Sequence, residues 1–246
     1  MADPAHYSST VNQVGHYCGR FSQGFFGEPQ NSFSNLAFVI GALYAFYVWR
    51  KRGSQDRWQV VLFALAACIG VGSFIFHSMP NRSTLMMDLV PIQIFALAYF
   101  FYIGIRHFRG TKLAVSGAVL LFFLVRQGWL QIAPRGFLGG GVSHIPTLAL
   151  LIPCGVYLHR KGQRLGNYML WASVTYFLAL LPRSWDLAFC AVNPYGLYWV
   201  WHLLTGLTAS ILVYGIIGAV PCSPDVSEQN RLPNHSDSPA GFANRS

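Results

Sequence analysis

The chain has 246 residues, of which 53% are hydrophobic, 15% are aromatic and only 10% are charged. Soluble domains carry about 25% charged residues, so this composition excludes a disordered chain and argues against an ordinary soluble domain. The formal net charge is +9, but a bias of basic residues towards one membrane face explains it without a nucleic-acid partner.

Seven stretches are long and apolar enough to cross a bilayer, which takes roughly 20 apolar residues. Five of them contain no charged residue, whereas the third contains Asp88 and the fourth contains Arg126. The predicted fold class is therefore an all-α integral membrane protein, a bundle of seven transmembrane helices. In chain order, the expected helices cover residues 29–49, 58–81, 83–105, 113–134, 136–159, 165–182 and 195–220.

The basic residues between these helices predict the orientation of the bundle, because Lys and Arg in short loops are retained on the cytoplasmic side. Ten of them fall in the first, third and fifth loops. At most four, with Arg183 assigned to the sixth loop, fall on the other side. The N-terminus is thus expected outside and the C-terminus in the cytoplasm.

Three regions follow from this topology. Residues 1–28 are expected to form an extracytoplasmic segment and residues 29–220 the membrane domain. Residues 221–246 are rich in Ser, Pro, Asn and Asp, which is typical of a disordered cytoplasmic tail. The expected location is the inner membrane of a bacterium or an ER/Golgi-type membrane of a eukaryote.

Polar residues inside the predicted helices are candidates for a functional site, because they are costly in lipid. Ser73 and His77 lie four residues apart, on one face of the second helix. Asp88 lies one to two turns inside the third helix, and His202 follows Tyr198 by one turn on the last helix. All are expected near the outer membrane face, at a similar depth, where imidazoles and a carboxylate can hold a metal ion.

Other residues are assigned weaker roles. His144 is expected at the outer start of the fifth helix, where it lines the same cavity or is simply solvated. Arg126 is expected to extend its guanidinium to the outer surface, and it is assigned no role. Cys18 and Cys190 both fall on the outer face, where oxidising conditions allow disulfides to persist.

The order and spacing of Ser73, His77, Asp88 and the Trp201-His202 pair resemble the alkaline ceramidase family, within the superfamily that includes adiponectin receptors. The resemblance is strongest to the bacterial branch and covers about residues 17–215. Further matching segments are Tyr17-Cys18, residues 28–38 and residues 183–190. The resemblance implies a zinc-dependent amide hydrolase that cleaves ceramide-type lipids into a long-chain base and a fatty acid.

The family's functional residues carry over to this chain as expectations. His77 and His202 correspond to zinc ligands, Asp88 and Ser73 to catalytic residues, and Cys18 and Cys190 to a disulfide.

One ligand of the family is replaced, since Tyr198 stands where the resemblance implies a third histidine. Tyr198 itself, or His144 as a substitute, is then the possible third ligand; otherwise the zinc site is degraded. Relatives from eukaryotes bind calcium with an acidic cluster near the N-terminus. This chain retains only Glu28 of that cluster, so no calcium site is predicted.

Two other functions remain open. A catalytically degenerate member would act as a seven-helix lipid receptor or sensor, which an assay of lipid turnover would distinguish. Paired membrane histidines can also be axial ligands of a haem, which a visible absorption spectrum would reveal. The sequence predicts no oligomeric state.

Overall fold

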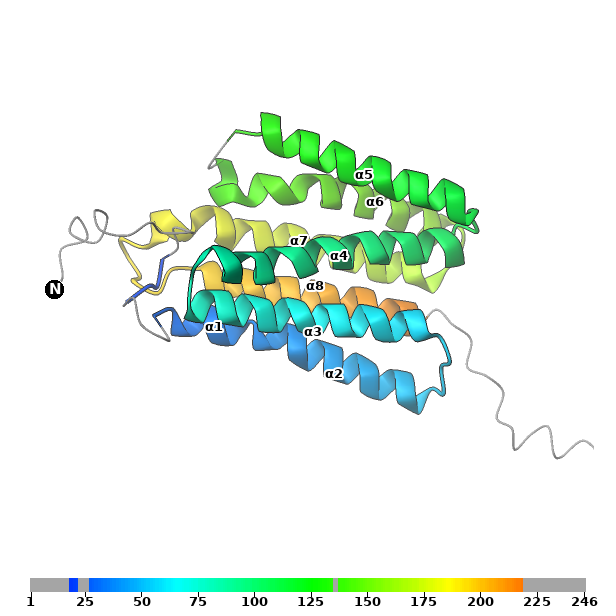
Figure 1. The fold of residues 1–246 in the computed structure, drawn as a ribbon, viewed down its shortest axis with the longest axis horizontal. Coiled ribbons are helices and arrows are strands. Elements are labelled where there is room, and N and C mark those ends of the chain that lie inside the picture. The colour runs from blue at the N-terminus through cyan, green and yellow to red at the C-terminus, as the bar shows by residue number, and fades with distance from the viewer. Residues whose placement is uncertain (1–17, 22–26, 135–136, 219–246) are drawn as a thin grey trace, which may run out of the picture.

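The computed structural model (Figure 1) describes residues 18–21, 27–134 and 137–218. The predicted C-terminal tail, residues 221–246, and most of the N-terminal segment lie outside the described residues. Within the described part every regular element is helical, in agreement with the all-α prediction. The helices are α1 (Pro29–Ser34), α2 (Leu36–Lys51), α3 (Arg57–Ser78), α4 (Arg82–Arg106), α5 (Lys112–Ile132), the 3₁₀-helix η1 (Phe137–His144), α6 (Ile145–Arg160), α7 (Arg164–Phe189) and α8 (Tyr198–Gly218).

The helices lie side by side along the long axis of the molecule, and α8 occupies the middle of the bundle (Figure 1). It packs against α7, α2 and α3, and Val213, Ile216 and Ile217 are almost completely buried. The helix at the edge is α5, of which only Val115 is buried. Its apolar side chains therefore suit contact with lipid rather than with protein.

Small residues allow the helices to approach one another closely, as is common in membrane bundles. A Cβ atom on Gly206 of α8 would lie 2.8 Å from the Cβ of Ala37 on α2. A Cβ atom on Gly72 of α3 would lie 2.0 Å from the carbonyl oxygen of Met87 on α4. The close approach of α3 and α4 also brings together Ser73, which follows Gly72, and Asp88, which follows Met87.

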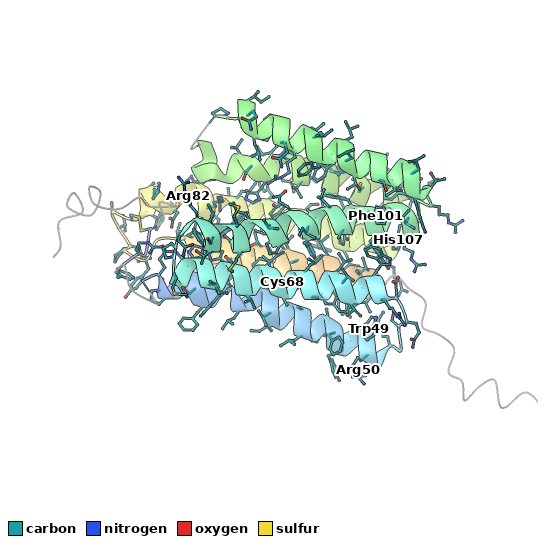
Figure 2. All side chains as sticks on the ribbon, in the orientation of Figure 1. Trp49, Arg50, Cys68, Arg82, Phe101 and His107 are labelled. Carbon is teal, nitrogen blue, oxygen red and sulfur yellow. A yellow bond between two sulfur atoms is a disulfide. The ribbon has the colours of Figure 1, made fainter. Side chains whose placement is uncertain are left out.

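Six of the seven expected spans are long and apolar enough to cross a membrane. The remaining helix, α7, has sufficient length but carries more polar residues, so its crossing stays a prediction, as do the positions of the termini. Arg50 and His107 lie at one end of the bundle and Arg82 lies at the other (Figure 2). This arrangement follows from the antiparallel order of consecutive helices.

Two of the differences from the predicted boundaries affect residues near the candidate site. The helix expected to end at Pro182 continues to Phe189, because a proline inside a membrane helix is tolerated where neighbouring helices pack around it. Arg183 therefore lies within α7, and its assignment to a loop is wrong. The segment expected to start a helix at residue 136 first forms the 3₁₀-helix η1, which contains three consecutive glycines, before α6 begins at Ile145.

A candidate active site at one end of the bundle

Three helices, α3, α4 and α8, carry the predicted site residues close to their ends at one end of the bundle. These residues are Ser73, His77, Asp88, Tyr198 and His202. His77 is the penultimate residue of α3, Asp88 is six residues from the start of α4, and Tyr198 begins α8. At a rise of 1.5 Å per residue, Asp88 and His202 lie roughly 6 to 9 Å inside the helix ends. Asp88 and His202, which are far apart in the sequence, thus lie at a similar depth in the bundle.

His77 is held by a carboxylate from the segment that precedes α1. Its Nδ1 lies 2.6 Å from Oε2 of Glu28, and both side chains are buried. Glu28 also forms an ion pair with Arg20 and accepts a hydrogen bond of 3.0 Å from the Asn31 amide. Burial alone would raise the pKa of Glu28, but the hydrogen bond from His77 and the charge of Arg20 lower it below the ordinary value of 4.5.

His202 is held in the same way by α1. Its Nδ1 lies 2.9 Å from the Ser34 hydroxyl, whose own hydrogen is donated to the Asn31 carbonyl at 2.9 Å. The Asn35 amide nitrogen, 3.4 Å from the same Nδ1, donates to the Asn31 carbonyl at 2.7 Å. With the Ser34 oxygen as the acceptor, His202 is assigned a proton on Nδ1. Because Glu28 likewise accepts from Nδ1 of His77, both imidazoles are assigned the tautomer whose lone pair is on Nε2.

The two imidazoles lie next to each other, with Tyr198 beside both. The ring centroids of His77 and His202 are 4.7 Å apart, and the Tyr198 ring is 5.7 Å from the first and 4.9 Å from the second. Tyr198 and His202 are one helical turn apart on α8, which places both rings on one face. The phenol thus occupies the side where the resemblance implies a third histidine.

A cavity of about 180 Å³ opens beside this cluster and reaches from α3 across to α5. Ser73, Asp88, Tyr198 and His202 line it, whereas His77 packs behind His202. The Ser73 hydroxyl is a hydrogen-bonding neighbour of the Asp88 carboxylate. Asp88 and Ser73, the two residues predicted to be catalytic, therefore lie together on one wall of the cavity.

Arg183 of α7 also lines the cavity. Its guanidinium donates to the Tyr198 hydroxyl and lies over two aromatic rings, 5.1 Å from the centroid of Tyr198 and 4.9 Å from that of Trp201. Such cation–π contacts favour a charged group in a desolvated place. Arg183 is thus linked to the histidine pair through the side chain of Tyr198.

His144 lies on another part of the cavity wall. Its Nδ1 is 2.6 Å from the Tyr176 hydroxyl, and its ring is 4.7 Å from that of Trp201. Of the two residues considered as a third ligand, Tyr198 is the one whose ring contacts both His77 and His202.

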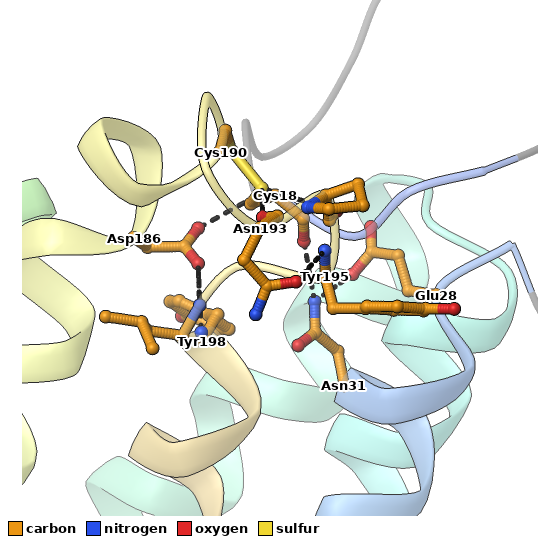
Figure 3. The surroundings of a disulfide bond; sticks show 10 residues. Cys18, Glu28, Asn31, Asp186, Cys190, Asn193, Tyr195 and Tyr198 are labelled. Carbon is orange, nitrogen blue, oxygen red and sulfur yellow. Dashed lines mark hydrogen bonds between the residues drawn. A yellow bond between two sulfur atoms is a disulfide. The ribbon is translucent and has the colours of Figure 1, made fainter. Parts of the chain in front are cut away.

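Asp186 fixes the start of α8 from outside the cavity (Figure 3). Its buried carboxylate accepts hydrogen bonds from the backbone amides of Leu197 and Tyr198, at 2.8 and 2.9 Å, and from that of Cys18 at 2.9 Å. Cys18 is also joined to Cys190 by a disulfide. The chain just before Glu28 and the first turn of α8 are thereby held together.

Sequence reasoning missed two features of this site. Glu28 was noted only as the remnant of an acidic cluster, although a lone acid beside a predicted membrane helix is a candidate partner for a buried histidine. Arg126 was expected at the outer surface, but it lines the cavity. Its position as the only charged residue within the predicted span 113–134 was a signal for such a role.

The donor atoms of the described residues decide whether this site fits a metal ion. In the part of the chain that the structure describes, no three His, Cys, Asp or Glu residues gather in a metal-binding group. Two adjacent imidazoles with lone pairs on Nε2 are nevertheless suitable zinc ligands, and the bonds from Nδ1 to Glu28 and Ser34 are of the kind that orients metal-bound histidines. The residues therefore fit a zinc ion that has two imidazole ligands and oxygen ligands.

The family model described as Ceramidase matches residues 22–232, which is most of the chain and includes every residue of the site discussed above except Cys18 and Arg20. No curated protein matches this sequence.

Proposed function

Because this chain belongs to the ceramidase family, we propose that it is a zinc-dependent hydrolase that cleaves the amide bond of ceramide-type lipids inside the membrane. The family itself implies amide hydrolysis and a ceramide-like lipid substrate, and the six candidate spans make the protein a multi-pass membrane protein. The proposal adds the metal, the catalytic residues and their roles.

One observation carries the proposal. His77 and His202 are adjacent, and each has its Nδ1 bonded to a polar side chain near α1. Two imidazoles, a carboxylate and a hydroxyl are costly to bury inside a membrane protein. Their burial at one place therefore indicates a functional site. The same end of the bundle holds Asp88 and Ser73 on a cavity wall.

Zinc would be held by Nε2 of His77 and of His202, with the Tyr198 oxygen as the possible third protein ligand. When bound there, zinc supplies a Lewis acid that polarises the amide carbonyl and lowers the pKa of water to about 7. Glu28 orients His77 and increases its basicity, as a carboxylate does for metal-bound histidines.

Asp88 acts as the general base and then as the general acid. It takes a proton from the attacking water, and it passes that proton to the amine nitrogen as the amide C–N bond breaks. The products are a fatty acid and a long-chain base. Once Asp88 is protonated it can donate to the Ser73 oxygen, so that the Ser73 hydrogen turns to the oxyanion that forms on the carbonyl.

Metal analysis tests the zinc ligands. We expect purified wild-type protein to bind one zinc ion per chain, and both His77→Ala and His202→Ala to lose it. His159→Ala is the control, since this histidine is exposed and bonded to Asn167 on the opposite end of the bundle. Retention of zinc by both site variants, or no zinc in the wild type after incubation with the metal, would overturn the proposed ligand set.

Turnover tests the chemistry. We expect Asp88→Asn to lower the rate of ceramide cleavage about 100-fold or more, the usual range for loss of a general acid–base group, while zinc binding persists. A lipid receptor that does not hydrolyse is the alternative, and the replacement of a histidine by Tyr198 favours it. Zinc binding without any cleavage by the wild type would support the receptor.

A further inference from the structure

One glutamine lies in the middle of a membrane span and has no role in the proposed hydrolysis. Gln93 is eleven residues after the start of α4 and thirteen before its end, which places it roughly 17 Å inside the bundle. It is partly buried, and it is one of the residues that line the cavity. Because a polar side chain at this depth is costly in lipid, Gln93 is a candidate for a functional role.

The spacing of the lining residues of α4 shows which face of the helix borders the cavity. Residues 88–89, 92–93, 95–96 and 99–100 line it, and a repeat of three to four positions corresponds to one helical face. Gln93 shares that face with Phe100, seven residues later, whose ring packs on Phe122 of α5 with 5.2 Å between the centroids. Gln93 therefore lies on the side of the cavity next to α5.

The amide group of Gln93 can both donate and accept hydrogen bonds. No hydrogen bond joins it to any part of the chain that the structure describes. Gln59, within the span of α3, differs in this respect, since it donates to the Tyr102 hydroxyl at 3.3 Å and to the Ile216 carbonyl at 3.2 Å. It also accepts from the Ser54 hydroxyl at 3.0 Å. The protein thus satisfies the amide of Gln59, whereas the amide of Gln93 is open to a ligand in the cavity.

Gln93 lies on the same helix as Asp88 and deeper in the bundle. The five residues between them correspond to about 7.5 Å along the helix axis. Helical side chains lean towards the N-terminus of their helix, which in α4 is the end that holds Asp88, so the amide group is closer to Asp88 than this distance. Deeper still, Phe100 and Leu212 line the cavity and suit a hydrocarbon chain. Gln93 thus lies between the proposed place of cleavage and the apolar part of the cavity.

We propose that Gln93 determines substrate specificity by hydrogen-bonding a hydroxyl group that the lipid carries a few carbon atoms from the amide that is cleaved. The inference rests on the proposed hydrolase function and narrows its substrate class to hydroxylated N-acyl lipids. A hydroxyl matches the side chain because both groups donate and accept. A lipid chain without it would leave the Gln93 amide against hydrocarbon, and a site that loses such a bond discriminates against that ligand.

Binding of inert analogues tests the proposal without turnover. The reference probe is N-octadecyl hexadecanesulfonamide, which has no hydroxyl and no carboxamide to hydrolyse. Two derivatives carry one hydroxyl on the third carbon of the sulfonyl chain or of the amine chain, and so separate an acyl-chain hydroxyl from one on the long-chain base. Affinities for the full-length protein in an uncharged detergent are measured by the shift in thermal unfolding temperature. We expect at least one derivative to bind about five- to tenfold more tightly than the reference probe.

Variants then assign the preference to Gln93. Gln93→Met keeps the length of the side chain without its amide and suits an apolar span, so its affinities for the three probes should agree within about twofold. Gln93→Leu is a second apolar variant and should behave in the same way, whereas Gln93→Asn should retain part of the preference. Gln127→Met is the matched control, because Gln127 is in the span of α5 but is not among the described residues that line the cavity. It should retain the full preference.

Equal affinity of the wild type for the three probes, or a preference that persists in Gln93→Met and Gln93→Leu, would overturn the role of Gln93. The corresponding carboxamides are then compared as substrates by kcat/KM, with the same order expected. Cleavage of all three with equal kcat/KM would contradict the specificity and leave the hydrolase function intact. If the probes show a preference that depends on Gln93 but no carboxamide is cleaved, the hydroxyl site stands and the proposed hydrolysis fails.

Discussion

At the scale of single residues, the candidate site is determined by the partners of its two histidines. Ser34 and Glu28 fix the tautomers of His202 and His77 by accepting from their Nδ1 atoms. Ser34 is the last residue of α1 and Glu28 directly precedes this helix, so both partners are far from α8 in the sequence. The short helix α1 therefore positions the chemistry although it does not line most of the cavity.

Replacement of Glu28 by Gln tests this role. Glu28→Gln keeps the size of the side chain but removes the charge that supports His77, so we expect the affinity for zinc to fall about 10- to 100-fold. Competition with a chelator of known affinity measures the change. Glu228→Gln, in the C-terminal tail, is the matched control and should bind zinc as the wild type does.

An unchanged zinc affinity in Glu28→Gln would show that the carboxylate does not act through a metal-bound His77. It would then serve to pair with Arg20 and to accept from the Asn31 amide.

Several residues of the site could be predicted from the sequence, because polar side chains inside apolar stretches are rare and conspicuous. Ser73, Asp88, His77 and His202 were selected in this way, and the structure brings them to one end of the bundle. The sequence could not predict the acceptors of His77 and His202, since hydrogen bonds between distant segments depend on how the helices cross.

At the scale of helices, the close crossing of α3 and α4 is what joins Ser73 to Asp88. Gly72 allows it, because a Cβ atom there would lie 2.0 Å from the Met87 carbonyl oxygen. The contact is with backbone, so a flexible side chain cannot relieve it. The spans of both helices could be predicted within a few residues, but the crossing point could not, since hydropathy carries no information on it.

We expect Gly72→Ala to separate α3 from α4 and to lower kcat/KM at least tenfold, a change of about 1.4 kcal/mol in the barrier. The unfolding temperature in detergent should fall as well. Gly117→Ala is the matched control, because no atom lies within 4 Å of a Cβ there, and it should be neutral. Wild-type kinetics in Gly72→Ala would contradict the role assigned to this crossing.

The continuation of α7 beyond Pro182 shows why a boundary matters for function. A proline and an arginine together predicted the end of a span, and Arg183 was therefore assigned to a loop. In the structure the helix continues, and the guanidinium turns to the cavity beside Tyr198. The neighbouring helices provide the packing that a sequence pattern does not reveal.

At the scale of the whole molecule, the disulfide and Asp186 connect the chain before α1 to the chain before α8. Cys18 is 172 residues from Cys190 in the sequence. The bond thus limits the separation of the two segments that supply Glu28 and Tyr198. We infer that it stabilises the site as well as the fold.

Cys190→Ser should therefore lower the stability of the protein by about 2–5 kcal/mol, the usual cost of losing a native disulfide, and weaken zinc binding. Thermal unfolding with and without a reducing agent measures the first effect. Cys68→Ser is the control, since this exposed cysteine is not disulfide-bonded. If the wild type unfolds at the same temperature under reducing and oxidising conditions, the bond does not contribute to stability.

The low charge content predicted a membrane bundle, and the few charges inside the spans predicted where its site lies. Six spans meet the criteria of length and hydropathy, and the family match extends over most of the chain. The central claim is that the site formed by His77, His202 and Asp88 hydrolyses a lipid amide.

The most direct measurement is the incorporation of oxygen from water enriched in ¹⁸O during incubation with ceramide. Hydrolysis at this site predicts one ¹⁸O atom in the fatty acid released by the wild type. It also predicts release slowed by about 100-fold or more in Asp88→Asn. Fatty acid release that is equal in Asp88→Asn, or no labelled fatty acid from ceramide in the zinc-loaded wild type, would contradict the claim.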